Sequence, residues 1–237
     1  MTHERICAVP KLSPESYAQW RASELGATTE RLERQLILEL LGDVTGREVL
    51  DVGCGDGDLA LEFAARGAIV TGIDASAEMI SVAEGRVKES NADVSFKVAL
   101  AENLPFPSGQ FDAVTAVAIL CFVVDAGPVF REIARVLRPN GRLVIGELGK
   151  WSTWAAARRI RGWLGSPLWR QGHFRTANEL RALAEQAGLA VESVRGAVYY
   201  PRWGFAARLI SSCDSRLGRL TTFGAGFVAL SAVKADR

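Results

Sequence analysis

The chain has 237 residues, with 28 lysines and arginines against 27 aspartates and glutamates, so its formal net charge is +1. A dedicated nucleic-acid-binding protein would carry a clear basic excess, and no nucleic-acid partner is expected. Hydrophobic residues make up 49% of the chain, and this length and composition predict one folded domain with a sizeable core.

No segment of the sequence has the features of a membrane span or a secretory signal. The longest apolar stretch, residues 113–124, is shorter than the roughly 20 residues of a membrane-spanning helix. The N-terminus lacks the apolar core of a signal peptide, and a cytoplasmic location is predicted. The four cysteines and two histidines are widely spaced, so neither a disulfide framework nor a metal site is indicated.

The predicted elements begin with an amphipathic helix over Thr28–Gly42, where leucines recur at helical spacing behind a threonine cap. From residue 48 onward, short apolar runs alternate with helical segments, which is typical of a parallel sheet covered on both faces. Helices are predicted at Ala77–Lys88 and Pro128–Leu137. The five predicted strands of this part are Glu48–Val52, Ile69–Ile73, Val94–Val98, Ala113–Val117 and Leu143–Glu147.

The remainder of the chain starts with a segment rich in tryptophan and arginine, in which a helix is predicted over Trp151–Leu164. A capping box at Thr176–Glu179 opens a helix that extends to about Gly188. Two apolar runs, Leu189–Val198 and Phe223–Val233, are predicted as the closing strands. These elements predict an α/β fold.

Three glycines lie directly after the first predicted strand, in the sequence Val-Gly-Cys-Gly-Asp-Gly-Asp of residues 52–58. Glycine at such a turn lets a ligand approach the backbone closely, because no Cβ stands in the way. Asp74 ends the second strand 19 residues after Gly55, a spacing at which a carboxylate can accept hydrogen bonds from ribose hydroxyls. Together, the loop and the acid indicate a nucleoside or nucleotide.

The loop also bears on which nucleoside binds. In the dinucleotide fingerprint G-x-G-x-x-G the third glycine would fall on Asp58, which disfavours NAD. Asp51, Asp56 and Asp58 form an acidic surrounding that suits a ligand with a cationic part. S-adenosylmethionine is such a ligand, since it carries an ammonium and a sulfonium.

Four motifs extend this interpretation: VLDVGCGDG (49–57), GIDAS (72–76), AENLPFPSGQFDAV (101–114) and REIARVLRPNGRLVIGEL (131–148). In order and spacing they resemble the class I S-adenosylmethionine-dependent methyltransferases, in the small-molecule branch similar to ubiquinone/menaquinone C-methyltransferases. The resemblance implies a Rossmann-like, doubly wound sheet of seven strands, mostly parallel with a final antiparallel strand. N-terminal helices and a helical lid after the fifth strand would complete it.

The resemblance also implies roles for individual residues. Asp51, Gly53, Cys54 and Gly55 would line the methionine and ribose part of the cofactor, and Asp74 would hold the ribose hydroxyls. The other expected cofactor contacts are Ala75 and Met79 near the adenine, Ala101 and Glu102 at its amino edge, Val117 and Ala118 under the sulfonium, and Tyr17 in a flap.

One position departs from the pattern of many relatives. They have an aspartate that binds the adenine amino group where this chain has Leu100. Either Glu102 or a backbone carbonyl replaces that contact, or the affinity for the cofactor is lower.

The methyl acceptor is expected beyond the carboxyl ends of the strands. Tyr17 and Trp20 either fold over the cofactor as a flap or pack the first helix on the sheet. His173 is the candidate general base, with tyrosines 17, 199 and 200 as alternatives. The residues predicted to face the acceptor are Trp20, Cys121, Phe122, Trp151, Trp154, Arg158 and His173.

The tryptophan- and arginine-rich segment is the most individual part of the chain, because it has no acidic residue between Glu147 and Glu179. Its predicted helix would pack through Ala156, Ala157, Ile160, Trp163 and Leu164 and leave a face with Trp154, Arg158 and Arg161 available. That face could bind an anionic or aromatic acceptor, rest on a membrane interface in peripheral contact, or be a solvated basic surface.

The predicted function is methyl transfer by in-line displacement from S-adenosylmethionine to a small molecule, apolar or anionic, which leaves S-adenosylhomocysteine. Two alternatives remain: a non-catalytic protein that binds these cofactors, and an NAD-dependent oxidoreductase. No oligomeric state is predicted. The parts of the single predicted domain are an N-terminal flap and helix (1–46), a cofactor-binding core (47–148), a lid (149–175) and the C-terminal part of the sheet (176–237).

Overall fold

The computed structural model describes residues 14–90, 92–202, 207 and 211–236. Predictions that involve residues 1–13, such as an unpaired Cys7, lie outside this part. A single sheet of seven strands runs through the molecule in the order β3-β2-β1-β4-β5-β7-β6. The strands are β1 (Glu48–Val52), β2 (Ile69–Asp74), β3 (Val94–Val98), β4 (Phe111–Val117), β5 (Leu137–Leu148), β6 (Leu189–Ala197) and β7 (Phe227–Lys234).

Strands β1 to β5 pair in parallel, while β7 pairs antiparallel with both β5 and β6. The Rossmann-like, doubly wound sheet with one antiparallel strand is therefore confirmed. The helices are α1 (Pro14–Ala22), α2 (Glu24–Leu41), α3 (Asp58–Ala65), α4 (Ala77–Ser90), the 3-10 turn η1 (Leu120–Phe122), α5 (Ala126–Val136), α6 (Thr153–Trp163), α7 (Pro167–Arg170), α8 (Ala177–Gln186) and α10 (Asp214–Leu220).

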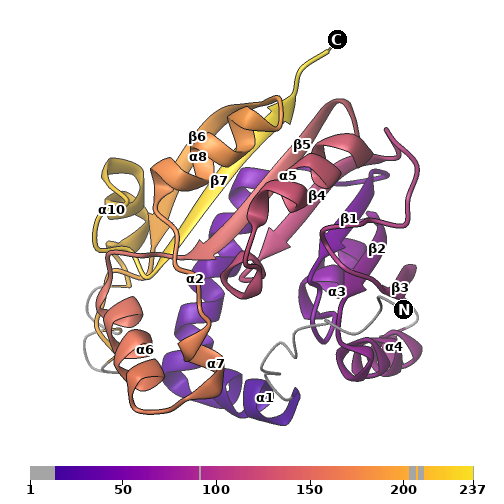
Figure 1. The fold of residues 1–237 in the computed structure, drawn as a ribbon. Coiled ribbons are helices and arrows are strands. Elements are labelled where there is room, and N and C mark those ends of the chain that lie inside the picture. The colour runs from indigo at the N-terminus through magenta and orange to yellow at the C-terminus, as the bar shows by residue number, and fades with distance from the viewer. Residues whose placement is uncertain (1–13, 91, 203–206, 208–210, 237) are drawn as a thin grey trace, which may run out of the picture.

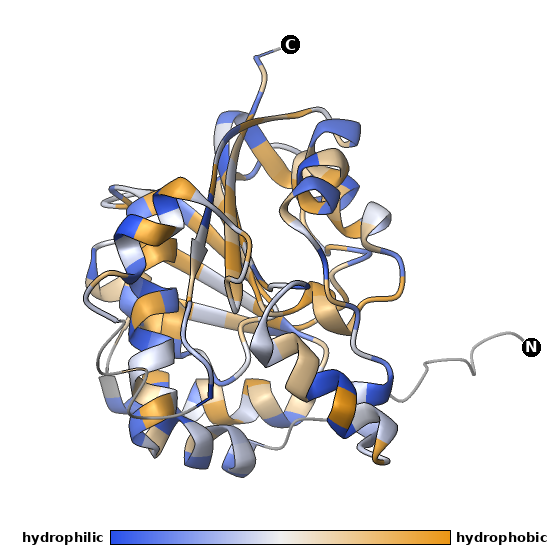
Figure 2. Cartoon of the chain, turned by 90° about the vertical axis from the view of Figure 1, so that its left-hand side faces the viewer, coloured by the Kyte–Doolittle hydropathy of each residue, from blue (hydrophilic) through white to orange (hydrophobic). Residues whose placement is uncertain are grey.

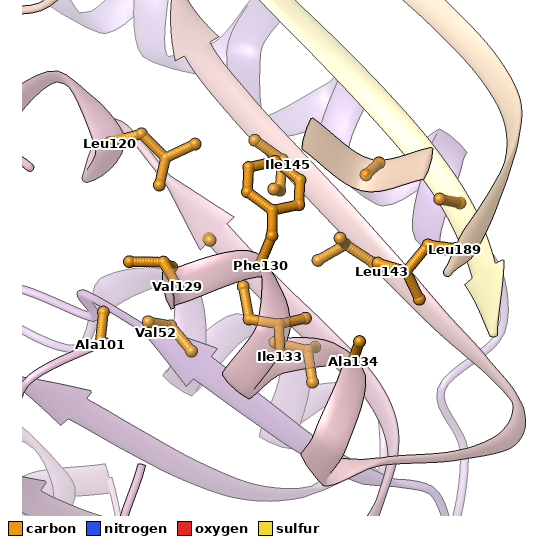
Figure 3. Close-up of a cluster of buried hydrophobic side chains, with 14 of the residues drawn as sticks. Val52, Ala101, Leu120, Val129, Phe130, Ile133, Ala134, Leu143, Ile145 and Leu189 are labelled. Carbon is orange, nitrogen blue, oxygen red and sulfur yellow. The ribbon is translucent and has the colours of Figure 1, made fainter. Parts of the chain in front are cut away.

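Each face of the sheet buries its own apolar layer, because alternate side chains of a strand point to opposite faces. In β1, Leu50 belongs to the layer under α5 and α8, whereas Val49 belongs to the layer under α2 and α3. Figure 3 shows the first layer, in which Phe130 and Ile133 of α5 lie against the strands. Figure 1 shows α1, α6 and α7 gathered at the lower end of the molecule.

Several predicted boundaries move. Helix α2 begins at Glu24 and is capped by Ser23, whose hydroxyl accepts a hydrogen bond from the Gly26 amide at 3.1 Å, so the predicted threonine cap is wrong. Thr29 lies inside the helix, and its hydroxyl donates to the Leu25 carbonyl. Strand β5 starts at Leu137, directly after α5, and β7 starts only at Phe227.

The predicted faces of the lid helix are reversed. In α6, Trp154 is 3% exposed, and its indole nitrogen donates to the Tyr200 carbonyl at 2.7 Å. Ile160, Trp163 and Leu164, which were expected to pack, are exposed instead. The physical reason is that the Trp154 ring and its N–H both find partners in the core, and α6 turns that side inward.

A buried carboxylate holds the chain where β6 ends. Asp214, at the start of α10, is 1% exposed and accepts hydrogen bonds from the amides of Val198 and Tyr199, both at 2.9 Å. Val198 is a β-branched residue with φ of +64°, a strained backbone conformation. The two hydrogen bonds stabilise this bend.

We expect Asp214→Ala to lower the free energy of unfolding by about 2–3 kcal/mol, because two buried amides lose a charged acceptor. Urea denaturation measures this loss. Asp236→Ala, at an exposed position, is the matched control. Equal stability of the two variants would contradict the role given to Asp214.

Candidate cofactor and acceptor site

The glycine-rich loop after β1 is tied to the neighbouring strand β2. The amides of Gly53 and Cys54 both donate to the Ile73 carbonyl, at 2.7 and 2.9 Å. Gly53 has φ of +72°, and a Cβ there would come within 2.9 Å of the Ile119 side chain. Gly55 also has positive φ, yet a Cβ there would meet nothing within 4 Å. The backbone at Gly55 therefore borders open space that a ligand can enter.

Asp74 links this loop to the loop after β2. One carboxylate oxygen accepts from the Gly55 amide at 3.0 Å, and the other accepts from the Ser76 amide at 2.8 Å. Each oxygen keeps a further lone pair that can accept from a hydroxyl. The geometry thus fits the predicted contact with two ribose hydroxyls.

Asp51 is a buried carboxylate with one hydrogen-bond donor described. The Thr115 hydroxyl donates to it at 2.7 Å, and the side chain is 2% exposed. Burial raises the pKa of Asp51 to about 6, against the lowering effect of that hydrogen bond. An ammonium group of a ligand would stabilise the ionised form, so the site suits the methionine end of the cofactor.

The acidic surrounding predicted from Asp56 and Asp58 is corrected by the structure, because arginines already neutralise both residues. Arg21 of α1 pairs with Asp56, and Arg34 of α2 pairs with Asp58. Arg86 of α4 reaches both carboxylates, at 3.0 and 3.2 Å. Of the three aspartates that the sequence suggested, only Asp51 is left without an arginine partner among the described residues.

The same network ties α1 to the glycine-rich loop. Helix α1 has no buried residue, and the Arg21 guanidinium that contacts Asp56 also lies 4.7 Å from the centre of the Tyr17 ring. Tyr17 and Trp20 stack at 6.1 Å between ring centres. The flap stays a prediction, and Arg21 joins its helix to the glycine-rich loop.

The remaining predicted cofactor residues lie around the same strand ends. Ala118 follows β4, has φ of +54° and donates through its amide to the Gly146 carbonyl. Leu100, where many relatives have the adenine-binding aspartate, is exposed and offers only an apolar side chain and its backbone. Of the other predicted cofactor contacts, Met79 and Ala101 are buried and Val117 is partly buried, while Ala75 and Glu102 are exposed.

The turn after β4, η1, is held by two residues that the sequence did not single out. A Glu147 carboxylate oxygen, buried at the end of β5, accepts from the Leu120 amide at 2.6 Å. Arg175 donates to the carbonyls of Leu120 and Val123. Glu147 lies at the end of a predicted strand, and Arg175 is one of several arginines in its segment. No local pattern therefore predicted that these two residues hold the turn.

Cys121 and His173 meet at this turn. The His173 amide donates to the Cys121 carbonyl at 2.9 Å, while the His173 residue itself is exposed. The Cys121 thiol is fully buried and donates to the Ala118 carbonyl at 3.3 Å. Burial raises the pKa of Cys121 well above its usual value. The thiol therefore stays neutral and lines the site without acting as a nucleophile.

Aromatic rings line the lid beside η1. Trp169 lies 6.4 Å from Phe122 and 6.3 Å from Phe174, measured between ring centres. The Arg158 guanidinium lies 5.1 Å from the Trp169 ring and 5.5 Å from the Trp154 ring. Among the described residues it has no hydrogen bond or ion pair, and burial lowers its pKa to about 10. Trp151 instead accepts through its carbonyl from the Gly224 amide, in the turn before β7.

Glu33 of α2 lies close enough to Arg158 for the two charges to interact, and sequence analysis missed it. Burial raises the pKa of Glu33 to about 8, while Arg158 opposes that rise. Glu33 also interacts with Tyr17 of the flap. Of the alternative bases, Tyr199 donates to the Thr221 carbonyl and Tyr200 bonds to Thr29, so both hydroxyls are engaged elsewhere.

Comparison with known proteins decides the family. Residues 50–145 match the family model described as a methyltransferase domain. The chain is 37% identical over 179 residues to a ubiquinone biosynthesis O-methyltransferase of Xanthomonas oryzae, covering 73% of this chain and 74% of the relative. The chain belongs to the class I S-adenosylmethionine-dependent methyltransferases.

Two further similarities extend over most of this methyltransferase. An uncharacterized protein of Mycobacterium tuberculosis is 33% identical over 218 residues, which cover 92% of this chain and 71% of that protein. A Thermotoga maritima structure described as a methyltransferase, "possible histamine N-methyltransferase", superposes with a TM-score of 0.71 at 21% identity, covering 93% and 95% of the two chains.

Family membership makes this protein an enzyme that uses S-adenosylmethionine. It decides against the NAD-dependent oxidoreductase and the non-catalytic binding protein. Within the described residues, the methyltransferase has no helix long and apolar enough to cross a membrane.

We expect Asp74→Ala to weaken binding of S-adenosylmethionine and S-adenosylhomocysteine by at least tenfold, because hydrogen bonds to a charged acceptor are lost. Calorimetric titration measures both affinities. Asp93→Ala, at an exposed position before β3, should bind like the unaltered protein. Unchanged binding by Asp74→Ala would show that the ribose lies elsewhere.

Proposed function

We propose that this methyltransferase transfers the methyl group to a hydroxyl oxygen of a small aromatic molecule that carries an anionic group. The observation that supports it most is Arg158, a guanidinium near two indole rings that has no ion pair with a carboxylate of the described residues. Such a cation recognises a carboxylate or phosphate, and the rings beside it accept a flat apolar body. The Xanthomonas relative, named an O-methyltransferase of ubiquinone biosynthesis, supports oxygen as the acceptor atom.

The proposed acceptor position lies between α2, η1 and the lid. Phe122 and Trp169 pack on the buried cluster that contains Cys121. The Cys121 thiol donates to the carbonyl of Ala118, which the family resemblance places under the sulfonium. Trp20 of the flap would close this position from the α1 side. Trp154 supports Arg158 from the core, and Trp151 lies outside this cluster.

The cofactor would be held by the residues predicted for it. Asp51 would bind the ammonium, Asp74 the ribose hydroxyls, and the backbone at Gly53 to Gly55 the ribose and methionine. When bound, S-adenosylmethionine supplies an electrophilic methyl group that transfers by in-line displacement. The protein orients the acceptor through Arg158 and excludes water with the aromatic rings of Phe122, Trp169 and Phe174. It also accepts the acceptor's proton.

Glu33 is the group proposed to accept that proton. It lies on α2, where its charge interacts with that of Arg158, and has no hydrogen-bond donor among the described residues, so its carboxylate is free for a ligand. A base with a pKa near the working pH is effective in proton transfer. His173, the base predicted from sequence, lies at η1 with an exposed side chain and is the competing candidate.

The acceptor proposal is tested with Arg158→Met and ring hydroxyl compounds in matched pairs, with and without a carboxylate. We expect kcat/KM for the carboxylated member to fall about 10- to 100-fold, since a charge-assisted contact is removed. The neutral member should change little, and Arg170→Met, at an exposed position of α7, should behave like the unaltered enzyme. An equal loss for both members would contradict anion recognition by Arg158.

The role of Glu33 predicts a pH dependence. A base works in its deprotonated form, so the rate should rise with pH through the range around 8, the pKa of Glu33. Glu33→Gln should lose this rise and at least tenfold in kcat, as measured by S-adenosylhomocysteine release. Glu39→Gln, an exposed position of the same helix, is the control. Loss of the pH-dependent rise in His173→Gln instead would assign the base to His173.

A further inference from the structure

The outer side of the lid helix α6 carries large apolar side chains that the described part of the chain leaves exposed. Trp163 is 83% exposed, Leu164 81% and Ile160 51%. Successive residues of a helix are turned by about 100°, which places these three together, opposite the buried Trp154 and Gly162. We call them the apolar stripe.

Arginines flank the apolar stripe on both sides. By the same helical geometry, Arg159 lies along one edge and Arg161 along the other. The Arg159 guanidinium is 5.3 Å from the Phe174 ring, and Arg161 is exposed. An apolar strip between two cationic edges is the pattern of helices that lie in the plane of an anionic membrane interface, where arginine stems reach the headgroups.

Further exposed apolar side chains continue this surface toward α10. The Gly224 amide donates to the Trp151 carbonyl at 3.0 Å, which joins the start of the lid to the turn that carries Phe223. Trp151, Phe223 and Leu220 are all exposed. Helices α6 and α10 lie on the same side of the molecule in Figure 1, the side that Figure 2 turns toward the viewer.

The two segments that form this surface carry charged side chains of only one sign, although the whole chain is nearly neutral. There is no aspartate or glutamate in residues 148–178 or in residues 215–235. Arg161, Arg170, Arg216 and Arg219 are exposed, and none of these four forms an ion pair among the described residues. Exposed cations near tryptophan and leucine complement anionic lipid headgroups.

We propose that the methyltransferase docks on anionic phospholipid bilayers through this surface, formed by the apolar stripe with Trp151, Leu220 and Phe223. Tryptophan side chains settle at the boundary between headgroups and acyl chains, and the arginines bind phosphate groups. The opposite side of α6 carries Arg158. The lid helix would then lie between the bilayer and the proposed acceptor position, so an acceptor dissolved in the bilayer would enter past this helix.

Co-sedimentation of the full chain with vesicles tests this. Vesicles of phosphatidylcholine alone are compared with vesicles that also contain phosphatidylglycerol. We expect binding to the anionic vesicles only, weakened by added salt because the headgroup attraction is screened. The double variant Trp163→Ser/Leu164→Ser should partition at least tenfold less. Val124→Ser, at another exposed apolar residue on the loop before α5, should bind like the unaltered chain.

Cofactor titration and light scattering accompany the vesicle experiment. The double variant should bind S-adenosylmethionine normally, because its altered side chains face outward, and this shows that it is folded. Absence of vesicle binding by the unaltered chain, or equal binding by the double variant, would overturn the proposal. So would a dimer of the unaltered chain that the double variant converts to a monomer without any vesicle binding, since the surface would then bind a second copy.

Discussion

Carboxylates at the ends of strands hold the loops of the neighbouring strands, and the site depends on this arrangement. Asp74, which ends β2, accepts from the Gly55 amide in the loop after β1. Glu147, near the end of β5, accepts from the Leu120 amide in the turn after β4. Parallel strands bring their carboxyl ends to one edge of the sheet. A carboxylate on one strand can therefore position the backbone that follows the next strand, on both sides of the central pair β1 and β4.

The charged groups of the site divide into those that the protein satisfies and those that it leaves for ligands. Asp56 and Asp58 are bound by Arg21, Arg34 and Arg86, so these residues build the flap and the loop. Among the described residues, Asp51 and Arg158 form no ion pair, although the charge of Glu33 acts on Arg158. A buried charge that lacks a partner costs free energy, and a bound ligand of opposite sign would recover that cost. For this reason we propose that ligand groups bind at these two charges.

The lid segment combines two environments in one helix. On its inner side Trp154 is buried in the core and Arg158 lies over the Trp154 ring. On its outer side Trp163 and Leu164 are exposed. Tryptophan and arginine suit either side, because both have an apolar body and a polar end. Composition alone therefore does not say which side of the helix turns inward, and packing decided that Trp154 does.

The sequence by itself determined the strands, the glycine-rich loop and the position of Asp74, because each depends on signals within a short stretch. The capping box at Thr176 and Glu179 formed as predicted for the same reason. The order of motifs along the chain, through the family resemblance, implied the seven-stranded sheet. Only the tertiary structure decided which aspartates stay free, which side of α6 turns inward, and that the charges of Glu33 and Arg158 interact. Those outcomes depend on contacts between residues far apart in the chain, and the pattern of one helix does not contain the partner that will bury it.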